Sequence, residues 1–228
     1  MPQILYIGGN MQEISASILT VEKEDAIHTF YNLETAKINY FHIDVMDGKF
    51  VEKNTLGLMK DYALTISHIS NLGLDVHLMV EDVEEIADEY LMLEPEILTF
   101  HIEATKTEER TKNLIEEIKT NGTRVGIAIS PDTKIEEIIK YLPYVHLVLV
   151  MTVVPGKGGQ KLIPETLEKV KELKKYTTEN NIDVDIEVDG GINDITAKEA
   201  IESGANILVV GNYLISADNL SEAVNKLK

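Results

Sequence analysis

The chain has 228 residues, of which 44% are hydrophobic, and it contains no cysteine. This length and composition are typical of one sizeable domain, and the lack of cysteine excludes disulfide scaffolds, thiolate zinc sites and cysteine nucleophiles. The formal net charge of −18 argues against nucleic acid or an anionic membrane as a partner, and no apolar run is long enough to cross a bilayer.

Short β-rich runs alternate with segments of helical period along the chain. Residues 1–13 stand outside this pattern as an N-terminal extension. We expect residues 14–228 to form one domain built from repeated strand–helix units. We expect strands at 14–19, 40–46, 74–80, 97–103, 124–130, 147–153, 184–189 and 207–211. Helical patterns between them include 83–93, 108–120, 164–176 and 195–203, with Asp194 as an N-cap and Gly204 as a C-cap. Eight such units predict a single (β/α)8 TIM barrel, with a doubly wound open sheet as the runner-up.

Polar side chains share one face of the second expected strand. Because strand side chains alternate, His42, Asp44 and Met46 point to the same side. An imidazole and a carboxylate on a buried strand are costly unless they are paired or bound to a metal. The third expected strand repeats the pattern with His77 and Met79.

Chemically useful side chains lie in the C-terminal halves of the expected strands, where barrel enzymes build their active sites. They are His42, Asp44, His77, Met151 and Asp189. The two histidines and two aspartates could hold one divalent cation, and this mixed set suits zinc, iron(II), manganese or cobalt. Asp44 and Asp189 also suit a two-base proton transfer, the alternative being that they only bind metal. His101 and Glu103 share a face of the fourth expected strand and are interpreted as supporting or structural residues.

Methionines and glycines recur at the same end of the expected barrel. Met46, Met79 and Met151 are either adaptable core residues or a polarizable lining that keeps water from a reactive intermediate. Glycines follow the last three expected strands at Gly156, Gly158, Gly159, Gly190, Gly191 and Gly211. In a barrel these glycines predict a phosphate site made of backbone N–H groups. Such local donors are needed because the net negative charge of the protein repels an anionic ligand.

Several motifs run in order over nearly the whole chain beyond residue 14. They are SIL at 17–19, HIDVMDGKFV at 42–51, DVHLMV at 75–80, HIEA at 101–104, VMTVVPGKGGQ at 150–160, IEVDGGI at 186–192 and VVG at 209–211. In these motifs the chain resembles the ribulose-phosphate 3-epimerase family of phosphate-binding (β/α)8 barrels. The resemblance implies that His42, Asp44, His77 and Asp189 hold a divalent metal ion. It also implies that Asp44 and Asp189 invert C3 of a ketose phosphate through a cis-enediolate.

The resemblance further implies a substrate pocket. Ser17 would hydrogen-bond the substrate, the three methionines would cap the intermediate, and the glycine loops with Asn212 would bind the phosphate. The chain departs from the usual family pattern in its loops, at Glu52, Lys53, Ser130, Val154, Lys157 and Asn212. Lys157 replaces an aromatic residue inside a glycine loop, so we expect it to supplement phosphate binding or adapt the pocket to another sugar phosphate.

The leading prediction is a metal-dependent 3-epimerase of D-ribulose 5-phosphate and D-xylulose 5-phosphate. The near alternative is the same chemistry on a hexulose phosphate such as D-allulose 6-phosphate. A phosphate-binding barrel decarboxylase is less favoured, because it would be expected to use a lysine and none of the strand-end residues named above is one. A non-catalytic sugar-phosphate sensor is also less favoured, because it would be expected to lack Asp44 or Asp189 and both are present. The family resemblance suggests a homo-oligomer. The first residues lack a secretory signal, so we expect a cytoplasmic location.

Overall fold

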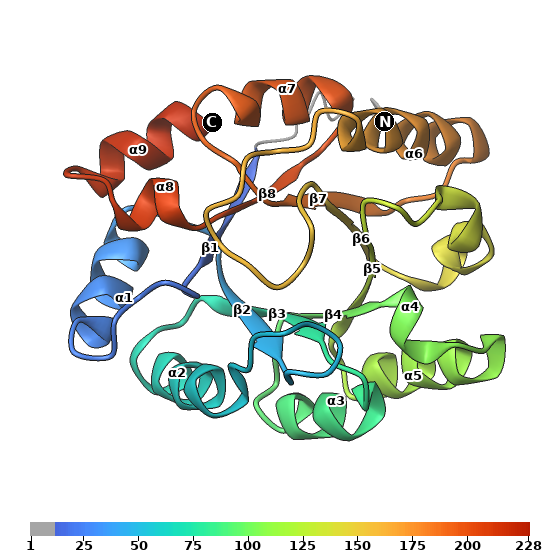
Figure 1. Cartoon of the computed structure of the whole chain (residues 1–228), viewed down its shortest axis with the longest axis horizontal. Coiled ribbons are helices and arrows are strands. Elements are labelled where there is room, and N and C mark those ends of the chain that lie inside the picture. The colour runs from blue at the N-terminus through green and yellow to red at the C-terminus, as the bar shows by residue number, and fades with distance from the viewer. Residues whose placement is uncertain (1–11) are drawn as a thin grey trace, which may run out of the picture.

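A closed barrel of eight parallel strands forms the centre of the molecule, and the computed structural model describes residues 12–228 of it (Figure 1). Neighbouring strands pair in sequence order, and β8 pairs with β1 to close the ring. The strands are β1 (Glu13–Ser17), β2 (Tyr40–Met46), β3 (Gly73–Met79), β4 (Ile97–His101), β5 (Arg124–Ile129), β6 (Leu147–Met151), β7 (Asp185–Asp189) and β8 (Ile207–Val210). The predicted TIM barrel is confirmed, and the closed ring excludes the open doubly wound sheet.

Helices surround the barrel (Figure 1). They are α1 (Ala26–Thr35), α2 (Leu56–Ile69), α3 (Val83–Leu91), α4 (Ile102–Thr105), α5 (Glu108–Thr120), α6 (Thr166–Asn180), α7 (Thr196–Ser203), α8 (Asn212–Ile215) and α9 (Leu220–Leu227). Two 3-10 segments, η1 (Ile135–Glu137) and η2 (Ile139–Tyr144), connect β5 to β6. Pro143 lies inside η2, and a proline cannot donate the backbone hydrogen bond that a longer helix would need there. None of the helices in the described part of the chain is both long and apolar enough to span a membrane.

The observed element ends differ from the expected ones by a few residues. The fourth strand ends at His101 because the next residues turn into α4, so Glu103 lies on a helix and the predicted shared strand face is wrong. Gly204 is the C-cap of α7 with φ 116°, as expected. Asp194 is not the N-cap, because Asn193 Oδ1 accepts the N–H of Ile195 (2.9 Å) and of Thr196 (3.1 Å) at that end.

Two apolar layers fix the barrel. The larger one lies between the strands and the helices, and a smaller cluster that includes Leu147, Leu149 and Met151 lies inside the ring. At the amino ends of the strands, a partly buried ion pair of Arg124 and Asp185 joins β5 to β7. Packing and ion pairing therefore close the barrel interior at the amino ends of the strands. The barrel is open at the carboxyl ends of the strands.

The predicted N-terminal extension falls mainly outside the described residues. Residues 1–11 are not among them, and β1 begins at Glu13, one residue before the predicted start of the domain. The extension thus stays a prediction.

Candidate active site

A cavity of about 550 Å³ opens at the carboxyl ends of the strands. The loop between β6 and α6 runs across this opening (Figure 1). Of the predicted site residues, those that line the cavity are Ser17, Asp44, Met46, Met79, Met151, Gly156, Lys157, Gly158, Gly159, Asp189, Gly190, Gly191, Gly211 and Asn212. His42 and His77 lie behind this wall, and each is fully buried. The structure thus brings the predicted residues to one end of the barrel.

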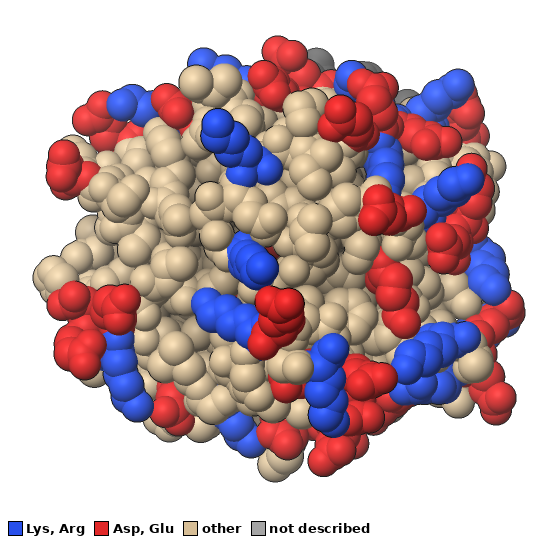
Figure 2. All heavy atoms as spheres, viewed as in Figure 1, with Lys and Arg blue, Asp and Glu red and all other residues tan. Residues whose placement is uncertain are grey.

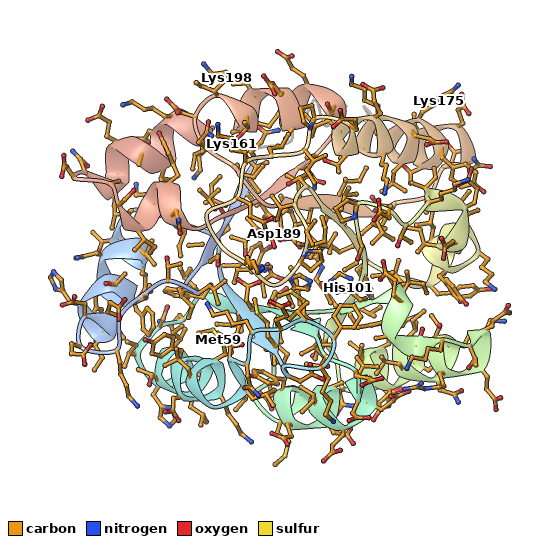
Figure 3. The ribbon with its side chains drawn as sticks, in the orientation of Figure 1. Met59, His101, Lys161, Lys175, Asp189 and Lys198 are labelled. Carbon is orange, nitrogen blue, oxygen red and sulfur yellow. The ribbon has the colours of Figure 1, made fainter. Side chains whose placement is uncertain are left out.

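Four side chains from three strands converge at the base of the cavity. Their ligand atoms, one each from His42, Asp44, His77 and Asp189, all lie within 4.8 Å of one another. Asp44 Oδ1 is 3.5 Å from His42 Nε2 and 3.4 Å from His77 Nδ1. Asp189 Oδ2 is 3.9 Å from His77 Nδ1, and Figure 3 shows Asp189 near the middle of the ring of strands. The register of β2 with β3 sets Asp44 directly beside His77.

This cluster fits a divalent cation. Within the described chain, His42 Nε2 and His77 Nδ1 are buried without a hydrogen-bond partner, a rare state for buried polar atoms. The nitrogen–oxygen separations of 3.4–3.9 Å are too long for good hydrogen bonds and leave room for an ion bound at about 2.0–2.2 Å from each atom. Two nitrogen and two oxygen donors suit zinc, manganese, iron(II) or cobalt.

Asp75 orients one of the two imidazoles. Its Oδ2 atom lies 2.6 Å from His42 Nδ1 and accepts a hydrogen bond of 2.6 Å from Ser15 Oγ. This contact turns His42 Nε2 toward Asp44 and the cavity. Sequence reasoning missed Asp75, although it lies two residues before His77 and therefore on the same face of β3. The same spacing links Glu187, which is also buried, to Asp189 on β7.

Burial and neighbouring charges drive the pKa values of the two aspartates apart. Burial, with added repulsion from Asp44, raises the pKa of Asp189 to about 7. Burial also opposes ionisation of Asp44, but the two histidines outweigh it and hold the pKa of Asp44 well below its usual range. A bound cation would lower the pKa of Asp189 as well. Two neighbouring carboxylates whose pKa values differ strongly are typical of a general acid and a general base that act together.

The histidines are available as ligands for different reasons. Burial lowers the pKa of His77 to about 4, so this imidazole is neutral. Burial acts in the same direction on His42, but Asp75 and Asp44 outweigh it and raise the pKa of His42. A cation that binds His42 Nε2 would therefore displace a proton, as metal binding to imidazole commonly does.

Apolar and hydroxyl groups surround the two aspartates. Met46, Met79 and Met151 are almost fully buried and line the cavity from three different strands. Ser17 Oγ donates a 2.8 Å hydrogen bond to Asp44 Oδ2. The lining also includes residues that sequence reasoning missed, namely Leu19, Thr20, Val153, Gln160, Lys161, Leu162, Pro164, Ile192, Asn193, Thr196, Glu199, Val209 and Tyr213. Of these, Lys161 had a signal, since it is a cation that follows a glycine loop directly.

Two glycines after β7 are required by the path of the backbone. Gly190 has φ +124° and Gly191 has φ +71°, which L side chains rarely adopt. A Cβ atom on Gly190 would lie 2.4 Å from Val153 Cγ2, and one on Gly191 would lie 2.3 Å from the backbone nitrogen of Leu162. The loops after β6 and β7 therefore pack backbone to backbone at the edge of the cavity.

Two of the residues that depart from the family pattern meet at the rim. Lys157 Nζ lies 3.7 Å from Glu52 Oε2, and their side chains are 72% and 91% exposed. In Figure 2 basic side chains lie over the middle of this face, while acidic side chains gather mainly around its edge. The cavity mouth therefore has less negative charge around it than the net charge of the chain suggests.

The barrel and its cluster of imidazoles and carboxylates define the class as TIM-barrel enzymes with a site suited to a divalent cation. Residues 13–215 match the family model described as "Ribulose-phosphate 3 epimerase family". The ribulose-phosphate 3-epimerase of Methanocaldococcus jannaschii is 38% identical over 218 residues, which cover 96% of this chain and 90% of that protein. The one from Bacillus subtilis is 36% identical over 219 residues, covering 96% and 99%. The chain belongs to the ribulose-phosphate 3-epimerase family and is an isomerase of the epimerase type.

A solved structure of more distant sequence shows the same fold. KGPDC from Streptococcus mutans is 12% identical with a TM-score of 0.67, covering 95% of each chain. At this identity the likeness concerns the barrel alone. The predicted family and fold are thus confirmed by independent comparisons.

Proposed function

We propose that this enzyme inverts the configuration at C3 of a ketose phosphate, converting D-ribulose 5-phosphate into D-xylulose 5-phosphate and back. One observation carries the proposal: Asp44 and Asp189 face the same cavity from β2 and β7, strands three places apart around the barrel. Carboxylates that reach one carbon from two directions suit removal of a proton from one side and its return from the other. The names of the two relatives agree with this reaction.

Each aspartate has a distinct environment for this work. Asp44 is held by Ser17 Oγ, so its carboxylate orientation is fixed before substrate arrives. Asp189 is more open, with 18% of its side chain exposed against 5% for Asp44. In the proposed reaction, one carboxylate takes the C3 proton, the other protonates the opposite face of the cis-enediolate, and the roles exchange in the reverse direction.

His42, Asp44, His77 and Asp189 would hold the divalent cation. When bound, such an ion stabilises negative charge on the C2 and C3 oxygens, which favours loss of the C3 proton. The three methionines contribute by excluding water, because their thioethers cover the cavity wall beside the aspartates. This would protect the cis-enediolate from unwanted protonation.

The phosphate would bind at the loops after β6, β7 and β8. Gly156, Gly158 and Gly159 lie on the first loop, Gly190 and Gly191 on the second, and Gly211 and Asn212 on the third. Exposed backbone N–H groups in such loops are a usual phosphate site in barrel enzymes. Lys157 and Lys161 would add positive charge at the same end. The cytoplasmic location and the homo-oligomer stay predictions.

Proton exchange with solvent tests the reaction directly. The protein is incubated in deuterium oxide with D-ribulose 5-phosphate or D-allulose 6-phosphate, before and after metal removal. We expect deuterium at C3 and formation of the epimer with the pentulose phosphate, and loss of both after chelation. Exchange with neither substrate would refute the epimerase proposal, and faster turnover of the hexulose phosphate would overturn the assigned substrate.

A further inference from the structure

A second imidazole lies directly behind His77. His77 Nε2 is 2.9 Å from His101 Nε2, and the two rings stack with centroids 5.1 Å apart at an angle of 24°. Both side chains are fully buried, and His101 does not line the cavity. Figure 3 labels His101 beside the site, at the end of β4. The proposed reaction gives this histidine no role.

The other nitrogen of His101 meets a carboxylate. His101 Nδ1 lies 3.1 Å from Glu103 Oε2, and Glu103 Oε1 accepts the N–H of Ser130 at 2.9 Å and the hydroxyl of Thr133. Burial opposes ionisation of Glu103, but its contacts with His101, Thr133 and Ser130 outweigh this and lower its pKa to about 2. Glu103 therefore acts as an acceptor in every contact, and His101 Nδ1 must be the donor.

For neutral imidazoles, these contacts determine which ring nitrogen of His101 and of His77 carries the proton. Two ring nitrogens at 2.9 Å share one proton, so one donates and the other accepts. In the neutral form of His101, whose single ring proton is then on Nδ1, Nε2 carries a lone pair and accepts from His77 Nε2–H. His77 then has a bare Nδ1, the atom that faces Asp44 and Asp189 and lacks a hydrogen-bond partner within the described chain.

We propose that His101 and Glu103 are positioning residues that hold His77 in the tautomer with its Nδ1 lone pair directed at the cation site. The inference rests on the cation site of the proposed function. It gives the two imidazoles opposite arrangements: His42 presents Nε2 with Asp75 behind it, and His77 presents Nδ1 with His101 and Glu103 behind it. Hydrogen-bond partners of this kind commonly change metal affinity by about 10–100-fold.

The loop after β5 holds Glu103 in place. Lys169 Nζ, on α6, donates to the carbonyl oxygens of Ser130 (3.0 Å) and Thr133 (2.5 Å), and also to that of Pro131. The loop therefore has a fixed path, and its Ser130 N–H and Thr133 hydroxyl keep Glu103 Oε1 occupied. Of the two Glu103 oxygens only Oε2 is left for His101, whose Nδ1 has one further and longer contact, with Ser130 Oγ at 3.5 Å.

The variant Glu103→Gln tests this direction with little change in volume. Its amide has a single oxygen, which must serve the two donors of the loop, so its NH2 group faces His101 Nδ1. We expect His101 to move its proton to Nε2 and His77 to move its proton to Nδ1. The matched control is Glu84→Gln, because Glu84 pairs with Arg110 between α3 and α5, outside the cavity lining.

Two measurements on the full chain read the outcome. Nitrogen-15 NMR of the imidazoles in metal-free protein reports which ring nitrogens carry protons, and competition with a chromophoric chelator gives the affinity for zinc. We expect His101 Nδ1–H and His77 Nε2–H in the original chain and in Glu84→Gln. In Glu103→Gln we expect a changed tautomer and zinc affinity weaker by about 10–100-fold.

The outcomes separate this inference from the proposed function. Unchanged imidazole spectra and unchanged zinc affinity in Glu103→Gln overturn the positioning role and leave the epimerase proposal intact. An original chain that binds neither zinc nor manganese, cobalt or iron(II) overturns the cation site itself. The NMR result on metal-free protein stands in both cases, because it reports the hydrogen bonds without a bound ion.

Discussion

Replacing Gly191 by alanine places a methyl group against backbone atoms of another loop. The new Cβ would lie 2.3 Å from the backbone nitrogen of Leu162 and 2.9 Å from its Cα. A side-chain rotation cannot relieve contacts with backbone, so the loop before α6 must move. The residue must also keep φ near +71°, which costs a non-glycine residue about 1–2 kcal/mol.

The expected loss of stability follows from these two terms. Overpacking in a tight region costs about 1–3 kcal/mol, so the free energy of unfolding should fall by about 2–5 kcal/mol in total. For a chain of 150–250 residues each kcal/mol corresponds to about 2–4 °C, so Tm should fall by about 4–20 °C. Because the displaced loop borders the cavity, KM for the sugar phosphate should rise as well.

Urea unfolding followed by circular dichroism measures the effect, and Gly57→Ala is the matched control. Gly57 lies in α2, is exposed, and has open space where its Cβ would be. Alanine there should raise the free energy of unfolding by about 0.5–1 kcal/mol, because glycine is a poor helix former. If Gly191→Ala unfolds at the same urea concentration as the original chain, the close packing of the two loops is refuted.

Three further changes have expected outcomes. Chelation of the cation should abolish turnover and lower Tm. Where the ion had been present at 100 times its Kd, the free energy of unfolding should fall by about 2.7 kcal/mol. Unchanged Tm and activity would count against a bound metal. Lys157→Ala should raise KM for phosphorylated substrates but hardly alter stability, because its ion pair with Glu52 is exposed; unchanged KM values for every candidate substrate would end its proposed role. Arg124→Ala should lower the free energy of unfolding by about 1.5–3 kcal/mol, measured by urea unfolding, because the charged hydrogen bond to Asp185 is lost. Steady-state kinetics should show an unchanged kcat, because the cavity lies at the opposite end of the barrel.

Alternation along the strands made most of the fold and site predictable from sequence. The second strand has the expected bounds, Tyr40–Met46, and its residues from Phe41 to Met46 are buried without a break. Since the strands of a closed parallel barrel end on the same side, His42, His77 and Asp189 could be placed together without knowing the loops. Their common location follows from topology alone.

The contacts behind the site depend on features that a linear pattern does not contain. Glu103 was expected on a strand, but α4 begins after His101 and turns its carboxylate toward the loop after β5. The hydrogen bonds from Lys169 to the carbonyl oxygens of the loop after β5 depend on how α6 packs beside that loop. The bonded loop residues, Ser130 and Thr133, lie 39 and 36 residues before Lys169 in the chain. The pairing of Glu52 with Lys157 likewise joins two loops whose paths are set by packing.

The pairing of β1 with β8 also has a consequence for synthesis on the ribosome. Ser15 pairs with Val209, so the ring closes only after almost the entire chain has been made. Chains emerge at about 5–20 residues per second, and contacts between distant segments form late. Asp189 likewise arrives well after the strands that carry the two histidines. The cluster of two histidines and two aspartates is therefore complete only after β7 has been made, and a nascent chain stalled before β7 should bind zinc weakly.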